Sequence, residues 1–275
     1  MKEMVRKLPA LAVFCLTLLV CCWWVIAATI LAVVKQWRGI APTNADFTDS
    51  GVLCLVILEL AGLAVLFRVG RIRGWSFESW GFQPSWLGTG AGVLLCLGMM
   101  SPKYVAIEFV GFGLAAGLGW LRGWSFATWK LPSSPASTAA DVLLCFALYL
   151  LVWGGNQVFV AIHPGTTAAH PPLISHVSLP FLILLVVVNP VFEETIQTGF
   201  FIQCLQRYGI WLALLPGALF RGFGHSYLGP GAVVGNFGFG LIVGFIYWKW
   251  RHLWPLFIAH ALFDLLLHFQ TRAAA

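Results

Sequence analysis

Two adjacent glutamates, Glu193 and Glu194, interrupt a stretch of sequence that is otherwise apolar. They follow an apolar run at 179–188 and precede another that begins at Phe200, so both carboxyl groups fall within hydrocarbon-like sequence. A charge at the centre of a bilayer helix costs at least about 2.5–3.5 kcal/mol on insertion scales, and two like charges also repel each other. Pro190, just upstream, frees backbone groups and permits a kink. The pair is predicted to line a polar pocket inside a membrane, and the alternative is a water-facing helix end.

Four more polar side chains recur in the apolar sequence that follows. Arg221 and His225 are four residues apart, and His260 and Asp264 repeat this spacing. Residues four apart share one face of a helix, so Asp264 can accept a hydrogen bond from His260 and fix its orientation. Taken singly, such residues could snorkel or hold helices together. Together with the glutamate pair, they supply three carboxylates and two imidazoles, which is the inventory of a hydrolase.

The composition places these residues in a membrane protein. The chain has 275 residues, of which 60% are hydrophobic and only 9% are charged, and its mean hydropathy is +0.87. A soluble domain of this size carries far more charge on its surface. Apolar runs of nearly 20 residues recur along the chain, as in membrane-spanning helices. We therefore predict an all-α, polytopic membrane protein with about eight or nine membrane-embedded helices.

The net charge of +6 is interpreted as a signal of orientation and not of nucleic-acid binding. Basic residues precede the first expected span, at about 9–34, and Arg68, Arg71 and Arg73 follow the second, at about 51–68. The loop between these spans is more balanced in charge. By the positive-inside rule, the N-terminus and the arginine-rich turn face the cytoplasm. The protein is expected to be an integral, multi-pass membrane protein.

The sequence also suggests a division into regions. Residues 1–178 are expected to form N-terminal membrane helices, 179–270 to hold the polar site, and 271–275 to be a short tail. Within the N-terminal region, the octet at 73–80 nearly recurs at 122–129, which is a spacing of 49 residues. This spacing indicates an internal repeat, which concerns architecture and not chemistry.

The order of the polar residues resembles the CPBP intramembrane protease family of metallo- or glutamate proteases. Its members include CAAX-processing prenyl endopeptidases and relatives linked to bacteriocin processing or self-immunity. Glu193-Glu194 matches the first motif, 221–230 resembles the bacterial form of the second, and 255–264 fits the third. The resemblance makes 179–270 a CPBP-like catalytic core, and it favours a bacterial cytoplasmic membrane.

The first motif departs from the family pattern at one position. The family normally has Glu-Glu-x-x-x-Arg-Gly, whereas in this chain Thr198 precedes Gly199. The missing arginine could have paired with a carboxylate, and Arg221 is the candidate for a replacement cation. The departure leaves the fold unaffected and bears on whether the protein is fully active.

The resemblance implies that a glutamate-activated water attacks a peptide carbonyl. Glu193 would be the general base, and His225 would help to hold the water and pass the proton. His260 would donate a hydrogen bond to the oxyanion. Glu194 points about 100° away from its neighbour on a helix, so it is expected to orient neighbouring groups. Asp264 would either orient His260 or be protonated.

We therefore expect an intramembrane endopeptidase that needs no cofactor. Its expected partners are a membrane-tethered peptide or lipid-modified protein substrate and membrane lipids, and no nucleic acid. In a metal-dependent alternative, Glu193, His225 and His260 would hold zinc with water in the fourth position.

Two non-proteolytic alternatives also stay open. A catalytically weakened relative could act as a membrane scaffold, chaperone or immunity protein that binds peptides without cleaving them. Glycine-rich, broken helices and further acids at Glu59 and Glu108 would also suit a transporter.

Overall fold

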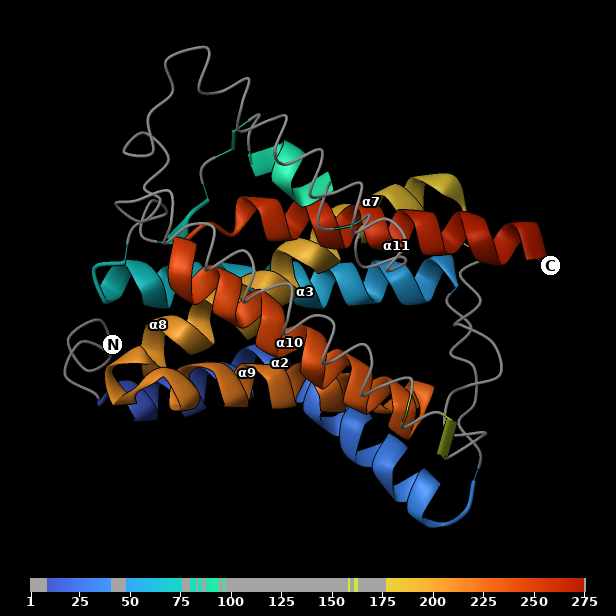
Figure 1. The fold of residues 1–275 in the computed structure, drawn as a ribbon, viewed down its shortest axis with the longest axis horizontal. Helices are drawn as coiled ribbons and strands as arrows, with labels where there is room; N and C mark the ends of the chain where they lie inside the picture. Colours follow the sequence, from blue (N-terminus) through green and yellow to red (C-terminus); the bar gives the residue numbers. More distant parts are fainter. Residues whose placement is uncertain are drawn as a thin grey trace.

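Apolar runs form helices throughout the described part of the chain. The computed structural model describes residues 9–40, 48–75, 80–82, 84–85, 88–93, 96, 158, 161–162 and 177–274. The helices whose bounds lie within these ranges are α2 (Ala10–Trp37), α3 (Asp49–Ile72), α7 (Leu179–Glu193), η3 (Glu194–Phe200), α8 (Phe201–Leu205), η4 (Gln206–Tyr208), α9 (Ile210–Gly224), η5 (Ser226–Leu228), α10 (Pro230–Trp250) and α11 (Trp254–Ala274). No strand occurs among the described residues, and the all-α prediction is confirmed (Figure 1).

Four helical stretches in this part of the chain are long and apolar enough to cross a membrane. They are Leu11–Trp37, Asp49–Ile72, Leu179–Tyr208 and Pro230–Trp250. The protein is therefore a helical membrane protein, and its first two spans lie where the sequence predicts them. The four stretches do not establish the predicted count of eight or nine, because several expected spans fall between 97 and 157, outside the described residues. Glu108 and the second copy of the octet fall there too.

The stretch Leu179–Tyr208 follows one continuous helical path. Pro190 lies inside α7, and the backbone then widens into the π-helix η3. The backbone N–H of Glu194, at the junction, bonds to the carbonyls of Pro190 and Val191. π-helical turns inside α-helices are rare and occur frequently at functional sites. The glutamate pair lies at this junction.

A sharp turn leads α9 back into α10, which packs against it. Gly229 has a φ of 100°, which only glycine adopts readily, and Pro230 takes the first position of α10. The backbone N–H of Leu228 donates to the carbonyl of His225 at 3.0 Å. This turn holds His225 and η5 beside the end of α2, where Gln36 donates to the carbonyl of Ser226.

Helix α3 packs along α7, and both run in the same direction. The backbone N–H of Ser178 donates to Asp49 at 2.7 Å, so the two helices begin side by side. Further along, a Cβ on Gly62 would lie 2.7 Å from the ring of Phe192, so only glycine allows this approach. Helix α11 also packs against α7 (Figure 1). These contacts bring α3, α7 and α11 together around the glutamate pair.

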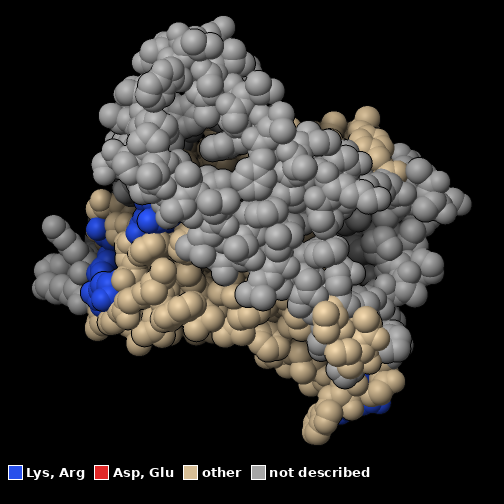
Figure 2. All heavy atoms as spheres, in the orientation of Figure 1, with Lys and Arg blue, Asp and Glu red and all other residues tan. Residues whose placement is uncertain are grey.

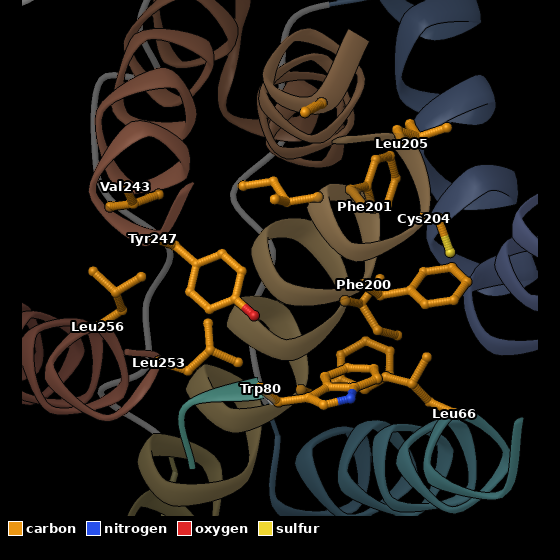
Figure 3. Packing of buried hydrophobic residues seen from close by; sticks show 14 of the residues in the cluster. Leu66, Trp80, Phe200, Phe201, Cys204, Leu205, Val243, Tyr247, Leu253 and Leu256 are labelled. Atoms are coloured by element: carbon orange, nitrogen blue, oxygen red, sulfur yellow. The ribbon is translucent and has the colours of Figure 1, made fainter. Parts of the chain in front are cut away.

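An aromatic-rich core joins the helices next to the π-helix (Figure 3). Phe14 of α2 stacks on Phe200 at 5.8 Å between ring centroids and meets the edge of Phe201 at 4.8 Å. Trp80 and Tyr247 complete this core and are 3% and 0% exposed. Because lipid tails are as apolar as these side chains, close packing contributes more than hydrophobic transfer to the association of such helices.

Basic residues gather at the end of the molecule where α3 and α10 end. Arg68 and Arg71 lie in the last turns of α3, Arg207 in η4, and Arg251 directly after α10. Figure 2 shows Lys and Arg atoms at this end, on the left of the view, and no Asp or Glu on the described part of this face.

Candidate active site

The two adjacent glutamates have different environments. Glu193 is the last residue of α7 and Glu194 the first of η3. The side chain of Glu193 keeps 17% of its surface exposed, whereas that of Glu194 keeps 1%. Oε2 of Glu193 is buried and has no hydrogen-bond partner among the described residues. One carboxylate is therefore enclosed, and its neighbour is partly accessible.

Three donors converge on the carboxylate of Glu194. Nη2 of Arg221 donates to its Oε1 at 2.6 Å, and Nδ1 of His260 donates to the same oxygen at 2.9 Å. The hydroxyl of Thr198 donates to Oε2 at 2.9 Å. Charge-assisted hydrogen bonds of this length are among the stronger ones in proteins, and together they satisfy both oxygens. Glu194 thus joins α9, α11 and its own helix.

Arg221 is a buried cation that faces both glutamates. It is 1% exposed, and its Nη1 lies 3.8 Å from Oε2 of Glu193. The guanidinium also lies over the ring of Phe239, 5.2 Å from the centroid. Where the first motif has Thr198 instead of arginine, Arg221 of α9 is the cation beside Glu194. The threonine hydroxyl bonds the other oxygen of the same carboxylate.

Both ring nitrogens of His260 face carboxylates. Nδ1 bonds to Glu194, and Nε2 lies 3.6 Å from Oδ2 of Asp264, one helical turn further along α11. A separation of 3.6 Å is longer than a hydrogen bond, so the bond predicted between His260 and Asp264 is not formed as expected. The orientation of His260 is fixed by Glu194 on another helix, which spacing within one helix does not reveal.

His225 lies at the end of α9 with a defined tautomer. Its Nδ1 is 2.9 Å from the carbonyl oxygen of Arg221, and since a carbonyl only accepts, Nδ1 carries the proton. In the neutral tautomer with this proton, Nε2 is an acceptor, which suits a residue that holds a water molecule. The ring of Tyr227 stacks beside His225, with 6.1 Å between centroids and planes 24° apart.

Two residues that sequence reasoning did not assign to the site also interact with it. The hydroxyl of Tyr227 interacts electrostatically with Glu193 and Asp264. The carboxyl group of Glu59 interacts electrostatically with Glu193, and also with the His260–Asp264 pair. For Tyr227, the signal in the sequence is its position two residues after His225.

Glu59 occupies a position that the helix pattern reserves for an apolar side chain. The buried face of α3 includes Val52, Val56, Leu63 and Leu66, and Glu59 takes its place in this stripe at 0% exposure. Neither of its oxygens has a hydrogen-bond partner within the described ranges. Glu59 is therefore a buried acid on the apolar face of α3. In the sequence, it is visible as a charged residue that interrupts the apolar stripe.

The metal-dependent alternative includes a side chain, His260, that is already engaged here. Among the described residues, no three His, Cys, Asp or Glu side chains are grouped as metal ligands. Nδ1 of His260 already bonds to Glu194. Binding of zinc by Glu193, His225 and His260 would require these side chains to move together, and it stays a prediction.

Comparison with known proteins identifies the region that contains these residues. Residues 175–266 match the family described as type II CAAX prenyl endopeptidase Rce1-like. No curated protein and no solved structure gives a significant match. The matched region covers about one third of the chain and includes every residue predicted for the site. The C-terminal region of this chain is thus similar to the Rce1-like family of type II CAAX prenyl endopeptidases, as its motifs predict.

Proposed function

We propose that this protein is an intramembrane endopeptidase in which Glu193 activates water against a peptide bond. The observation that carries this proposal is the difference between the two adjacent carboxylates. Glu194 is enclosed and receives three hydrogen bonds, whereas Glu193 is partly exposed and has an oxygen without a hydrogen-bond partner in the described part. A general base needs a lone pair that no donor occupies. Both oxygens of Glu194 accept hydrogen bonds, whereas the buried Oε2 of Glu193 accepts none from the described residues.

In the proposed reaction, Glu193 takes a proton from water while the water oxygen bonds to the carbonyl carbon. Nε2 of His225 accepts a hydrogen bond from the same water and holds it in place. When the tetrahedral intermediate collapses, the C–N bond breaks and the proton held by Glu193 passes to the leaving nitrogen. Glu194 holds Arg221 and His260 in position and touches no reacting atom.

We propose a membrane-tethered or lipid-modified peptide as the substrate, with membrane lipids as the other partners. An apolar groove with a volume of about 420 Å³ supports this choice. It lies between α2 and α9, and its lining includes Phe14, Leu18, Phe220 and Phe223. Helix α9 lines this groove and also carries Arg221 of the site. A hydrocarbon chain in the groove would therefore contact a helix that contributes to the site.

The test is cleavage of a peptide library, with and without a prenyl group, by the purified protein in liposomes. The Glu193→Gln variant should lose at least about 10²-fold in kcat and keep its thermal midpoint. Glu194→Gln is the matched comparison, and it should lose stability as well as activity, because three donors then face a neutral amide. Retained cleavage by the Glu193→Gln variant would contradict the proposal.

Two further arms separate the alternatives. Cleavage that survives a chelator supports the metal-free mechanism. Loss of cleavage when the chelator is added supports the zinc-dependent alternative. No cleavage by a stable wild-type protein under any condition would favour a scaffold, chaperone or immunity protein that binds peptides only. This outcome is tested because Thr198 stands where the family motif has arginine, which bears on whether the protein is active.

We also propose a bacterial cytoplasmic membrane with the N-terminus in the cytoplasm. The arginines at the ends of α3 and α10 support this orientation, since cytoplasmic loops carry the excess of Lys and Arg. Reporter fusions after residue 40 and after residue 73 test this orientation. The fusion after residue 73 should report the cytoplasm, and the fusion after residue 40 should report the opposite side of the membrane.

A further inference from the structure

Arg221 and His260, the two nitrogen donors of the site, already face carboxylates. Nη2 of Arg221 bonds to Glu194, and Nη1 lies 3.8 Å from Glu193. His260 bonds to Glu194 through Nδ1 and faces Asp264 with Nε2. A tetrahedral intermediate needs a hydrogen-bond donor aimed at the oxygen on which negative charge develops. Arg221 or His260 would have to be shared with a carboxylate to serve as that donor.

Tyr227 provides a donor that is not engaged in this way. It lies in η5, where its ring stacks beside His225, the residue that would hold the attacking water. Its hydroxyl interacts electrostatically with Glu193 of α7 and Asp264 of α11. It makes no hydrogen bond to any residue that the structure describes. The ring of Tyr227 thus lies beside His225, and its O–H is available.

Hydrogen bonds hold the backbone of the turn that carries Tyr227. Gln36 of α2 holds the carbonyl of Ser226, and the backbone N–H of Gly229 bonds to the same carbonyl at 3.0 Å. Burial raises the pKa of the Tyr227 hydroxyl above its usual range, and the charges of Glu193 and Asp264 raise it further. The hydroxyl therefore stays protonated at neutral pH and is a neutral donor.

We propose that Tyr227 donates its hydroxyl hydrogen to the oxyanion that forms when water attacks the peptide carbonyl, an inference that rests on the proposed function. The hydrogen bond strengthens as the carbonyl π electrons move onto oxygen, and the phenol keeps its proton throughout. When the C–N bond breaks and the carbonyl re-forms, this hydrogen bond weakens again. Because the donor is held by the protein and is uncharged, it is aimed at the oxyanion without reorganisation.

The experiment compares Tyr227→Phe with Tyr208→Phe in liposomes, using a peptide that the wild-type protein cleaves. Tyr227→Phe removes only the hydroxyl and keeps the ring beside His225. Its kcat should fall by about 10²–10³-fold, with little change in KM or in the thermal midpoint. Tyr208 is exposed, at the basic end of the molecule, so its variant should behave like wild type.

A peptidyl phosphonate, which mimics the tetrahedral oxyanion, supplies a second readout. It should bind Tyr227→Phe more weakly than wild type, whereas the substrate peptide should bind both equally. A structural role for Tyr227 would instead lower the thermal midpoint or raise KM, and either change without loss of kcat overturns the proposal.

The failure of this inference differs from the failure of the proposed function. If wild type cleaves, Glu193→Gln does not, and Tyr227→Phe cleaves at the wild-type rate, only the role of Tyr227 is wrong. If wild type does not cleave at all, the proposed function and the role of Tyr227 are both wrong.

Discussion

Glu194 and Glu59 are two completely buried glutamates on helices that pack together, and their surroundings differ. Both are 0% exposed. The carboxylate of Glu194 accepts hydrogen bonds from Arg221, His260 and Thr198. Neither oxygen of Glu59 has a hydrogen-bond partner in the part of the chain that the structure describes.

This difference separates two ways in which a membrane protein holds a buried acid. Around Glu194, three donors offset the loss of water, and the acid serves to fix an arginine and a histidine from two other helices. Around Glu59, the neighbours along α3 are apolar, so its polar oxygens are buried at a cost in free energy that no hydrogen bond offsets. Such a cost within reach of Glu193 indicates a functional role.

The largest expected effect comes from removing the Arg221 guanidinium, which bonds to Glu194. Arg221→Met keeps the length of the side chain and leaves the Glu194 carboxylate without its closest donor. Breaking one partner of a buried ion pair should lower the free energy of unfolding by about 3–5 kcal/mol. Unfolding in mixed micelles with increasing denaturing detergent measures this change.

Arg207→Met is the matched control for this variant. Arg207 is an exposed arginine in η4, and its loss should change the free energy of unfolding by less than about 0.5 kcal/mol. Equal effects of the two substitutions would show that Arg221 does not hold the site together.

A substitution at Glu59 should act in the opposite direction. Glu59→Leu restores the apolar stripe of α3 and removes two oxygens without hydrogen-bond partners, so the free energy of unfolding should rise by about 1–3 kcal/mol. The same mixed-micelle titration, run beside Glu194→Leu, measures the contrast, because Glu194→Leu should destabilise strongly. A Glu59→Leu protein that is less stable than wild type would show that the burial of Glu59 does not lower the stability of the protein.

Cleavage by the same Glu59→Leu protein shows what the burial of this acid is for. A variant that is more stable and less active would show that Glu59 contributes to the reaction although it lowers stability, which is a stability–activity trade-off. A variant that is more stable and equally active would make Glu59 dispensable to the chemistry.

The helices were predictable from the sequence because the length of an apolar run decides them. The spans expected at about 9–34 and 51–68 correspond to α2 and α3. Within 179–208, a proline and two carboxylates left open whether two half-helices or one bent helix forms. The π-helix that continues the path depends on backbone hydrogen bonds, which a single sequence does not specify.

The contacts within the site were harder to predict than the residue types. The motifs pointed to Glu194, Arg221 and His260, and the structure brings these three within hydrogen-bond distance. Spacing within one helix favoured a hydrogen bond between His260 and Asp264. In the structure, the packing of α11 beside the glutamate pair instead places Nδ1 of His260 within hydrogen-bond distance of Glu194. The sequence associates Glu59 only with the transporter alternative, because no sequence pattern shows which groups face it from α7 and α11.

The smallest expected effect concerns the threonine that stands where the family has arginine. Thr198→Val keeps the shape of the side chain and removes the hydrogen bond to Oε2 of Glu194, which should lower the free energy of unfolding by about 0.5–1.5 kcal/mol. Thr195 is a control in the same π-helix, because its buried hydroxyl has no partner among the described residues. Thr195→Val should therefore leave stability unchanged or raise it slightly. If both variants lose the same free energy, the hydroxyl of Thr198 does not contribute to holding Glu194, and Arg221 and His260 hold that carboxylate without it.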